Sequence, residues 1–409
     1  MLNSILIVNQ PLGNRGDEAA HRAFVRSINN TFPQVHIDIV WIGAPQKYVD
    51  EFIVDHPNNH YINLGIPHDY FAKGFGESAM RCGCNLKLIA SFHPILRKLK
   101  SYYLTADLVL CAPGGICMGG FQDWVHLFFL EMAKTYHKSL GYFARSFGPF
   151  PTKTWQNKRF KKISLELLHY FCNLSIRDKK TMALADEMRI PYIPSIDAAF
   201  LERPTAISAT VKQEDRYIVF VPNKLTWHYA YKNYPQEIID DFYLSILTQL
   251  FAQYPNHKVV MLPQTSSTPG NKNSDYYYFV HLRNQCQFAR QIEILPDTCG
   301  SDEQQAIIKS ASLVVGARYH SIVFAINNAR PFIALNYEHK IEGLLDILEL
   351  QKYKVDITDI FSSQRDISKA LNQFSNLLTQ PIGYDTEEKY QKAHTIASNG
   401  FQLFFNSMH

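Results

Sequence analysis

Short apolar runs alternate with amphipathic patterns along most of this chain. Residues 313–315 are apolar at every position, which is typical of a parallel strand with both faces buried. After Gly316, the spacing of Ile322, Phe324 and Ile326 changes to that of a helix. The same alternation predicts strands at residues 5–9, 37–42, 61–64, 106–111, 140–143, 174–178, 193–200, 217–221, 258–262, 292–295 and 331–337, of which residues 331–337 form the last.

A polar stretch at residues 202–216 has no apolar period and separates two halves that each alternate strand with helix. This pattern predicts an α/β protein with two Rossmann-like, doubly wound parallel-sheet domains that face each other across a cleft. We expect an N-terminal domain at residues 1–203 and a C-terminal domain at 204–380. Residues 381–409 predict a helix whose aromatic side chains pack on a domain, with membrane contact as the weaker alternative.

Composition excludes several classes of protein. At 46% hydrophobic and 19% charged residues, the 409-residue chain is typical of a globular protein, and a net charge of +4 does not indicate a nucleic-acid binder. The first residues are interpreted as a strand and not as a signal peptide, and no segment approaches the roughly 18 apolar residues of a spanning helix. Seven cysteines without framework spacing predict reduced thiols in a cytoplasmic protein. Close pairs at 82/84 and 111/117 suggest a metal site only weakly, because they lack zinc-ribbon spacing.

Arg318 and His320 lie at the turn between the predicted strand at 313–315 and the helix that follows it. Ligands of open parallel sheets bind at the carboxyl ends of strands, and the following helix N-terminus favours an anion. Arg318 can hold a phosphate or carboxylate through paired hydrogen bonds, and His320 can transfer a proton near neutral pH. The alternative is structural: Arg318 would cap a carbonyl and His320 would be a core histidine.

Glycine-rich turns follow two other predicted strands. Residues 13–18 carry Asn14, Gly16, Asp17 and Glu18, where the glycine lets the backbone approach a ligand and a carboxylate either caps the next helix or reaches the cleft. This turn has neither a Walker loop nor a dinucleotide-binding fingerprint. Another turn contains the candidate substrate-binding residues Gly114 and Gly115, with Asp123 just beyond.

Two further segments carry candidate binding residues. Arg177 follows a short strand and would either pair with Asp178 or hold an anion, while Gln264 lies in a polar loop after the strand at 258–262. Basic residues also crowd one helical segment. They are interpreted as a solvated face or, alternatively, as a surface for an anionic membrane or lipid diphosphate; they are Lys153, Lys158, Arg159, Lys161 and Lys162.

Taken in order, these motifs resemble the polysaccharide pyruvyl transferases over residues 5–345. The resemblance rests on Asn-Arg-Gly-Asp-Glu-Ala at 14–19, Gly114-Gly115, Phe-Gly-Pro at 147–149, Ile-Arg-Asp at 176–178, Asp197, Gly-Ala-Arg-Tyr-His at 316–320, Pro331 and Lys340. Two positions depart from the family pattern: Ile116 replaces a frequent third glycine, and Arg330 replaces a small residue before the proline.

The resemblance implies a GT-B type fold and transfer of the enolpyruvyl unit of phosphoenolpyruvate onto two sugar hydroxyls as a ketal. It assigns donor binding to Arg318 and His320. Because this donor carries a phosphate and a carboxylate, a second cation is needed, for which Arg177 and Lys340 are the candidates. His320 suits the acid role, and a carboxylate would accept the hydroxyl proton; the candidates are Asp17, Glu18 and Asp123. No metal or cofactor is expected.

The resemblance further implies a capsule or exopolysaccharide pathway, with galactose bridged at O4 and O6 on a lipid-linked oligosaccharide as the acceptor. The protein is expected in the cytoplasm, with possible peripheral contact at the inner face of the membrane. One alternative keeps the architecture but uses a nucleotide-sugar donor, which makes the protein a glycosyltransferase. Another, from a different class, is a non-catalytic protein that binds glycan or anion in a surface-polysaccharide assembly.

Overall fold

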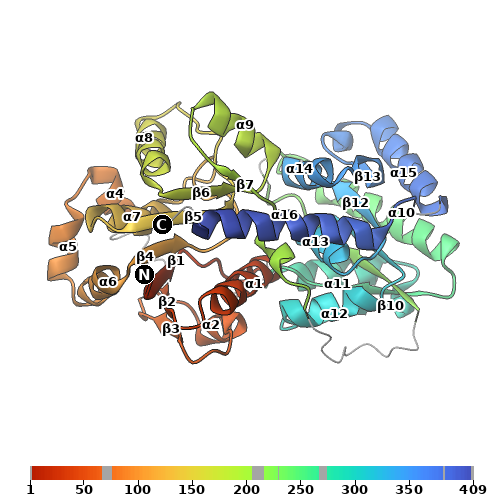
Figure 1. Cartoon of the computed structure of the whole chain (residues 1–409). Coiled ribbons are helices and arrows are strands. Elements are labelled where there is room, and N and C mark those ends of the chain that lie inside the picture. The colour runs from red at the N-terminus through yellow and green to blue at the C-terminus, as the bar shows by residue number, and fades with distance from the viewer. Residues whose placement is uncertain are drawn as a thin grey trace. The chain divides into compact units, whose positions relative to one another are not determined.

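The chain folds into two compact units. The computed structural model describes residues 2–66, 76–204, 216–228, 230–266, 274–380 and 383–406. Unit 1 comprises Met1–Leu12, Asp17–Glu202 and Thr395–His409, and unit 2 comprises Gly13–Gly16 and Arg203–His394. Most of the predicted linker (205–215) and part of the loop that follows Gln264 (267–273) lie outside the described residues. Both units consist of strands and helices (Figure 1).

Unit 1 is a seven-stranded parallel sheet in the order β3-β2-β1-β4-β5-β6-β7. Its strands are β1 (Ser4–Val8), β2 (His36–Trp41), β3 (Asn59–Asn63), β4 (Leu108–Cys111), β5 (Ser139–Arg145), β6 (Asn173–Ile176) and β7 (Ile193–Pro194). Its helices are α1 (Arg15–Thr31), α2 (Gln46–Phe52), α4 (Glu77–Cys82), α5 (Leu86–Phe92), α6 (Pro94–Thr105), α7 (Trp124–Thr135), α8 (Trp155–Tyr170) and α9 (Lys179–Glu187). Every residue of β4 and β6 is buried, as expected of central strands in a parallel sheet; β4 is apolar throughout, whereas β6 also buries the polar residues Asn173 and Ser175.

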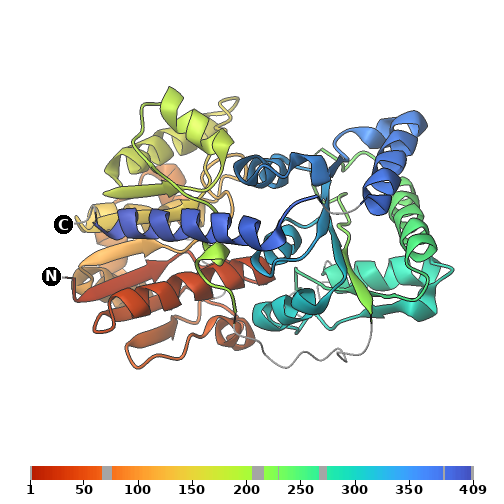
Figure 2. The same ribbon diagram turned by 45° about the vertical axis from the view of Figure 1, so that its right-hand side comes forward.

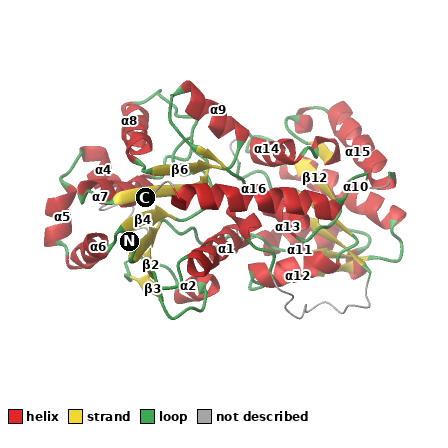
Figure 3. Cartoon of the chain, in the orientation of Figure 1, coloured by secondary structure: helices red, strands yellow, loops and turns green. Residues whose placement is uncertain are grey.

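Unit 2 repeats this plan with a six-stranded parallel sheet in the order β10-β9-β8-β11-β12-β13. Its strands are β8 (Tyr217–Val221), β9 (Lys258–Met261), β10 (Ile292–Ile294), β11 (Leu313–Gly316), β12 (Phe332–Asn336) and β13 (Lys354–Asp356). Its helices are α10 (Gln236–Gln253), α11 (Asp275–Gln285), α12 (Ser301–Ser310), α13 (Tyr319–Asn327), α14 (His339–Leu348), α15 (Gln364–Thr379) and the first part of α16 (Thr386–Asn406). Figure 3 shows helices around the strands of each unit.

Both strand orders are those of doubly wound nucleotide-binding sheets, in which the chain reverses direction across the sheet beside its first strand. The prediction of two Rossmann-like parallel-sheet domains is therefore confirmed. The reversal falls between β1 and β4 in unit 1 and between β8 and β11 in unit 2. In such folds the crevice outside the carboxyl ends of these strands is the usual ligand site.

Two predicted strands differ in the structure. Residues 331–337 were expected to form the last strand, but β13 pairs with β12 beyond it, at Ala334↔Lys354. Only Ile193–Pro194 of the predicted strand at 193–200 is extended, because the Asp197 side chain accepts a hydrogen bond from the Ala199 amide and starts a short 3-10 helix at Ala198–Leu201.

Helix α16 belongs to both units. The predicted domain boundary follows residue 203, whereas the structure divides the chain after Glu202 and assigns the C-terminal half of α16 to unit 1. There Phe401 lies edge-on to Phe24 of α1 and Phe143 of β5, with ring centroids 6.1 and 5.9 Å apart. Asn173 also donates to the backbone oxygen of Phe404 at 2.5 Å. These contacts fix the end of α16 against the helix and strands of unit 1 (Figure 2).

Within the described ranges, none of the helices combines the length and the apolar character that a membrane span needs. All seven cysteines lie in those ranges as free thiols.

Candidate active-site residues at the carboxyl edges of the two sheets

Arg318 marks the point in unit 2 where β11 gives way to α13. It is the N-cap of α13, and its guanidinium forms an ion pair with the carboxylate of Asp275. The same Nη2 also lies 3.4 Å from the hydroxyl of Thr265, and the guanidinium carbon is 5.8 Å from the centre of the Trp227 ring. Arg318 therefore gathers side chains that follow β8, β9 and β11, at the reversal point of this sheet.

The charge of Arg318 is maintained by its surroundings. Burial alone would lower the pKa of this guanidinium, but the Asp275 carboxylate acts in the opposite direction and raises the pKa above its usual value. The side chain is 16% exposed, and its Nε is buried with no hydrogen-bond partner among the described residues. The site thus keeps a permanent cation with donor capacity that the described residues leave unused.

The sequence analysis did not identify Asp275 as a site residue, although this carboxylate organises the edge of unit 2 around Arg318. Its carboxylate is almost completely buried and accepts hydrogen bonds of 3.0 Å from the backbone amides of Gln264 and Thr265. The same carboxylate therefore both fixes the loop after β9 and orients Arg318. The only signal in the sequence was an acidic residue in the first turn of a helix after a polar loop.

His320 lies in the first turn of α13 and is 8% exposed. Its ring makes an edge contact with Tyr319, with centroids 4.9 Å apart, and packs near Phe324 at 6.3 Å. The backbone at Gly16 approaches this ring so closely that a Cβ added there would lie 1.8 Å from Cγ of His320. The sequence analysis related the glycine at position 16 to a close approach to a ligand, whereas in the structure the group that the backbone approaches is the imidazole of His320.

The segment Gly13–Gly16 is part of unit 2 through backbone contacts with the loop after β9. Asn14 forms an isolated antiparallel bridge with Thr265, and the Arg15 amide donates to the Gln264 oxygen at 2.9 Å. The Asn14 side chain accepts from the Gly16 amide at 2.9 Å. The structure therefore brings together five of the predicted residues: Asn14, Gly16, Gln264, Arg318 and His320.

A substitution at Gly16 should loosen this arrangement. In Gly16→Ala the new methyl group would collide with the His320 ring, and overpacking of this kind costs about 1–3 kcal/mol. We expect the amide of Arg15 to lose protection against hydrogen exchange by about 5- to 150-fold, the factor that this free energy represents. Gly120→Ala is the matched control, because nothing lies within 4 Å of its added Cβ. Unchanged exchange at Arg15 in Gly16→Ala would show that the segment does not pack on His320.

Lys340, the reserve cation, lies at the carboxyl edge of the neighbouring strand β12. Its ammonium is 3.8 Å from Glu338, which also accepts a 2.9 Å hydrogen bond from the hydroxyl of Tyr337. Burial and then the Glu338 carboxylate raise the pKa of Tyr337, and the Arg318 cation acts in the opposite direction. Lys340 remains 19% exposed and is the second cation available on this edge.

Unit 1 carries a second cluster at its own reversal point, built on an arginine that the sequence analysis overlooked. Arg145 ends β5, is 1% exposed, and donates to the backbone oxygens of Ala112 and Gly115 and to the sulfur of Cys117, the last two at 3.1 Å. Burial would lower the pKa of Arg145, but the thiols of Cys111 and Cys117, the Tyr142 hydroxyl and, last, the Asp17 carboxylate raise it above its usual value. Arg145 thus holds the Gly114-Gly115 turn in place.

Asp17 lies beside this turn, since a Cβ at Gly114 would be 3.4 Å from both a carboxylate oxygen of Asp17 and Nη1 of Arg145. Asp17 is half-buried, whereas Glu18 is only 2% exposed and lies 3.9 Å from Arg22. Asp123 is exposed and caps α7 by accepting from the His126 amide at 3.0 Å. Among the three predicted carboxylates, the geometry favours Asp17 as the group at the glycine turn.

Arg177 has a different environment from the one its proposed role requires. Its side chain is 4% exposed and forms an ion pair with Asp197, which is completely buried. The sequence suggested Asp178 as an internal partner, but Asp178 instead caps α9 and accepts from Ser146 and Thr181. An arginine this deeply buried is less accessible to a substrate than Lys340 is, so Lys340 is preferred to Arg177 as the second cation.

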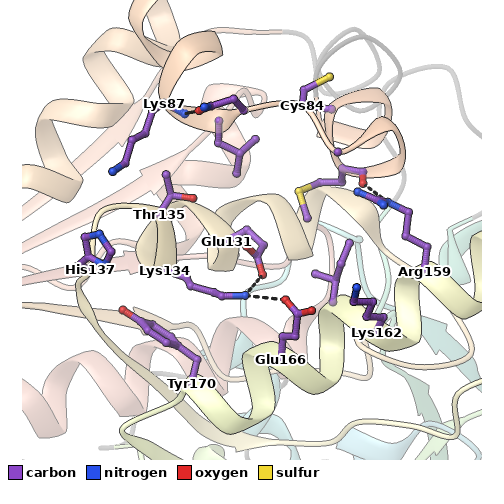
Figure 4. Close-up of a pocket in the computed structure, with 16 residues that line it drawn as sticks. Cys84, Lys87, Glu131, Lys134, Thr135, His137, Arg159, Lys162, Glu166 and Tyr170 are labelled. Atoms are coloured by element: carbon purple, nitrogen blue, oxygen red, sulfur yellow. Dashed lines mark hydrogen bonds and ion pairs between the residues drawn. The ribbon is translucent and has the colours of Figure 1, made fainter.

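A cavity of about 820 Å³ lies elsewhere in unit 1, among α4, α5, α7 and α8. Figure 4 shows Lys134 reaching two carboxylates, Glu131 at 3.3 Å and Glu166 at 2.9 Å. Lys87, Arg159 and Lys162 also line this cavity, and two of them belong to the basic run found in the sequence. None of the predicted catalytic or substrate-binding residues borders it.

Comparison with known proteins covers most of the chain. Residues 14–339 match a family model described as polysaccharide pyruvyl transferase. The amylovoran biosynthesis protein AmsJ of Erwinia amylovora is 20% identical over 380 residues, which cover 87% of this chain and 88% of AmsJ. The matched region begins at Asn14 and includes Arg318 and His320, but ends one residue before Lys340.

Solved structures with a similar fold have very different sequences. The UDP-GlcNAc 2-epimerase of Methanocaldococcus jannaschii, in complex with UDP-GlcNAc and UDP, has a TM-score of 0.54 at 14% identity and covers 98% of this chain and 100% of its own. The epimerase of Neisseria meningitidis bound to UDP-GlcNAc has a TM-score of 0.55 at 12% identity, with 99% and 98% covered. These likenesses concern the GT-B-like fold alone.

Proposed function

The chain belongs to the polysaccharide pyruvyl transferase family, and on this premise we propose that it moves the enolpyruvyl group of phosphoenolpyruvate onto two hydroxyls of a sugar. The proposed product is a 4,6-ketal on galactose of a lipid-linked oligosaccharide, made in the cytoplasm for a capsule or exopolysaccharide. The single observation that carries this proposal is the ion pair between the partly exposed Arg318 and the buried Asp275, close in the chain to His320 and at the reversal point of a doubly wound sheet.

Donor binding follows from the charges at this edge. Phosphoenolpyruvate carries a phosphate and a carboxylate, which two separate cations can hold. Asp275 engages Nη2 of Arg318, so the remainder of the guanidinium can hold one anionic group, while Lys340 supplies the second cation. Because Asp275 fixes the guanidinium before the donor arrives, little ordering is needed when the donor binds. Arg177 is not part of this proposal.

The chemistry needs one proton delivered to carbon and protons removed from two hydroxyls. Protonation of the donor methylene makes it a methyl group and leaves an oxocarbenium-like centre, which the first sugar hydroxyl attacks. The second hydroxyl then displaces phosphate and closes the ketal, so that one hydroxyl proton balances the carbon proton and the other leaves with phosphate. We assign the proton donor to His320 and the hydroxyl base to Asp17, which directly follows Gly16 in the chain. Fixed cations stabilise the departing phosphate.

The test is a reaction with defined substrates. The purified protein is incubated with phosphoenolpyruvate and a panel of synthetic galactosides and mannosides, and both phosphate release and acceptor mass are followed. The proposal expects phosphate release matched by an acceptor mass gain of one pyruvate less one water. Sugar transfer from a nucleotide sugar would instead support the glycosyltransferase alternative, and binding of glycan without turnover would support the non-catalytic alternative.

We further propose that a basic and aromatic surface of unit 1 contacts an anionic membrane, where a lipid-linked acceptor would be presented. Trp155 begins α8 and is 60% exposed, and Phe92 ends α5 and is 78% exposed. Basic side chains occur on the same helices, and Lys87 of α5 and Lys162 of α8 line one cavity (Figure 4). Exposed aromatic rings together with lysines are what an interface with anionic lipid requires.

Vesicle flotation tests this surface. We expect the protein to float with vesicles that contain anionic lipid. With purely zwitterionic vesicles, it should remain at the bottom of the gradient. The variant Lys158→Glu with Lys162→Glu should lose most of this binding, since each basic residue near such a surface contributes about 1 kcal/mol. Lys309→Glu with Lys369→Glu makes the same change of charge on exposed lysines of unit 2 and should float like the wild type. If both variants lost vesicle binding equally, the binding would depend only on net charge, and the assignment of the membrane-contacting surface to unit 1 would be wrong.

A further inference from the structure

A cluster of possible metal ligands lies at the amino edge of the sheet in unit 1, far along the strands from the glycine turns. His36 and Asp38 are two positions apart in β2, so the period of a strand directs both side chains to one face. The parallel register pairs Asp38 with His60 of β3. Two imidazoles and a carboxylate therefore meet on the same face because of strand period and register alone.

The distances between these groups suit a single cation. Nε2 of His36 lies 3.1 Å, and Nδ1 of His60 lies 3.7 Å, from the same oxygen of Asp38. One ligand atom from each residue can be chosen so that all three lie within 4.8 Å of one another. Bonds of about 2.0–2.1 Å in tetrahedral geometry place neighbouring ligand atoms about 3.4 Å apart. Small rotations of the two rings would bring the three atoms to that spacing.

An ordinary ion pair explains this arrangement less completely. One carboxylate with one imidazole would be sufficient for an ion pair, but here a second imidazole stands at right angles to the first, with ring centroids 4.2 Å apart. If Asp38 paired with both rings as cations, two positive charges would lie side by side. With neutral rings, two nitrogen lone pairs and a carboxylate oxygen can instead converge on one metal ion.

The ligand set defines the class of metal. Two imidazole nitrogens and one carboxylate oxygen suit zinc and its borderline neighbours cobalt, nickel and copper, whereas magnesium and calcium prefer all-oxygen sites. The side chains of His36 and His60 are 42% and 53% exposed, so the ion can enter from solvent, and water can complete its coordination. Among the described residues, this is the one group of three such side chains close enough to share an ion.

We propose that His36, Asp38 and His60 form a binding site for a divalent transition-metal cation of the zinc class, which links β2 to β3. The site lies at the amino ends of these strands, and the candidate catalytic residues lie at carboxyl ends. It is therefore a structural site, separate from the proposed transfer reaction. Because the ligands come from two strands, the bound ion opposes separation of β3 from the sheet and stabilises the folded state by linkage.

Cobalt and zinc titrations of the full chain test this site. The metal-free protein is titrated with Co²⁺, which gives visible absorption bands when nitrogen and oxygen ligands enclose it, and Zn²⁺ is then added to displace it. We expect one equivalent of Co²⁺ bound with visible bands, loss of those bands when Zn²⁺ is added, and a rise in thermal midpoint with Zn²⁺. His60→Ala and Asp38→Asn should each lose that equivalent and the thermal shift.

His169→Ala is the matched control, because it removes an exposed histidine of α8 and leaves the cluster intact. It should bind Co²⁺ as the wild type does. The proposal is overturned if the wild type binds no cobalt, or if His60→Ala binds as much as the wild type. Equal loss in His169→Ala and His60→Ala would also overturn it, since binding would then reflect surface histidines in general.

Discussion

Replacing Arg318 by alanine is expected to lower kcat/KM for phosphoenolpyruvate by about 10²- to 10³-fold, the usual effect of removing one preorganised donor to an oxyanion. The guanidinium is held by the buried Asp275, and its Nε has no partner among the described residues. Steady-state kinetics of phosphate release, with donor and acceptor varied separately, measure this effect. We expect the decrease in kcat/KM mainly when phosphoenolpyruvate is the varied substrate.

Arg318→Lys is the matched control for charge and stability. Alanine leaves the Asp275 carboxylate buried without its cation, which by itself destabilises the loop after β9. Lysine keeps a cation beside Asp275 but removes the planar fork, so it should restore thermal stability and only part of the activity. A fully active alanine variant would exclude Arg318 from donor binding.

Breaking the Arg177–Asp197 pair is expected to cause the largest loss of stability. Both side chains are at most 4% exposed, and removing one partner of a buried ion pair costs about 3–5 kcal/mol, because the other charge remains buried. We therefore expect Arg177→Met to lower the free energy of unfolding of unit 1 by that amount, as measured by denaturant titration. At temperatures where the variant is folded, its KM for phosphoenolpyruvate should equal that of the wild type.

The double variant Arg177→Met with Asp197→Leu separates the two roles of this arginine. Replacing both charges by apolar side chains removes the unpaired carboxylate and should recover part of the lost stability, because the hydrogen bond from the Ala199 amide to Asp197 is lost as well. If Arg177 held the donor, KM would rise in the single and double variants alike while stability changed little. That pattern would contradict the structural role assigned here.

The sequence predicted most of the fold because strand burial is a local property. Residues 217–221 and 258–262 are apolar runs bounded by polar turns, and they form β8 and, with one residue fewer, β9. The short strand β13 escaped detection because it lies at the sheet edge, and two of its three residues, Lys354 and Asp356, are charged. A strand of this kind depends on its neighbour for its conformation and leaves little apolar signal.

The candidate site was predictable in part. The rule that ligands bind at carboxyl ends pointed to Asn14, Gly16, Gln264, Arg318 and His320, which the structure gathers in unit 2. These residues lie together because of the strand order. Once both halves are recognised as doubly wound sheets, this order can be inferred, and with it which motifs lie at neighbouring strand ends.

Charge partners were the part that the sequence did not predict. Asp275 lies 43 positions from Arg318, and Asp197 lies 20 positions from Arg177, so neither pairing has a local signal. Arg145 was overlooked because a buried arginine at a strand end has the same sequence appearance as an exposed one. Residues this far apart in the chain become partners through tertiary packing. The spacing of apolar residues does not indicate which charged side chains will pair in the interior.

The most direct test of the central claim is calorimetric titration of the protein with phosphoenolpyruvate and, separately, with uridine diphosphate. We predict one site for phosphoenolpyruvate, lost in both Arg318→Ala and His320→Ala, and no comparable binding of uridine diphosphate. Binding of uridine diphosphate at a site that Arg318→Ala abolishes, without binding of phosphoenolpyruvate, would contradict the claim.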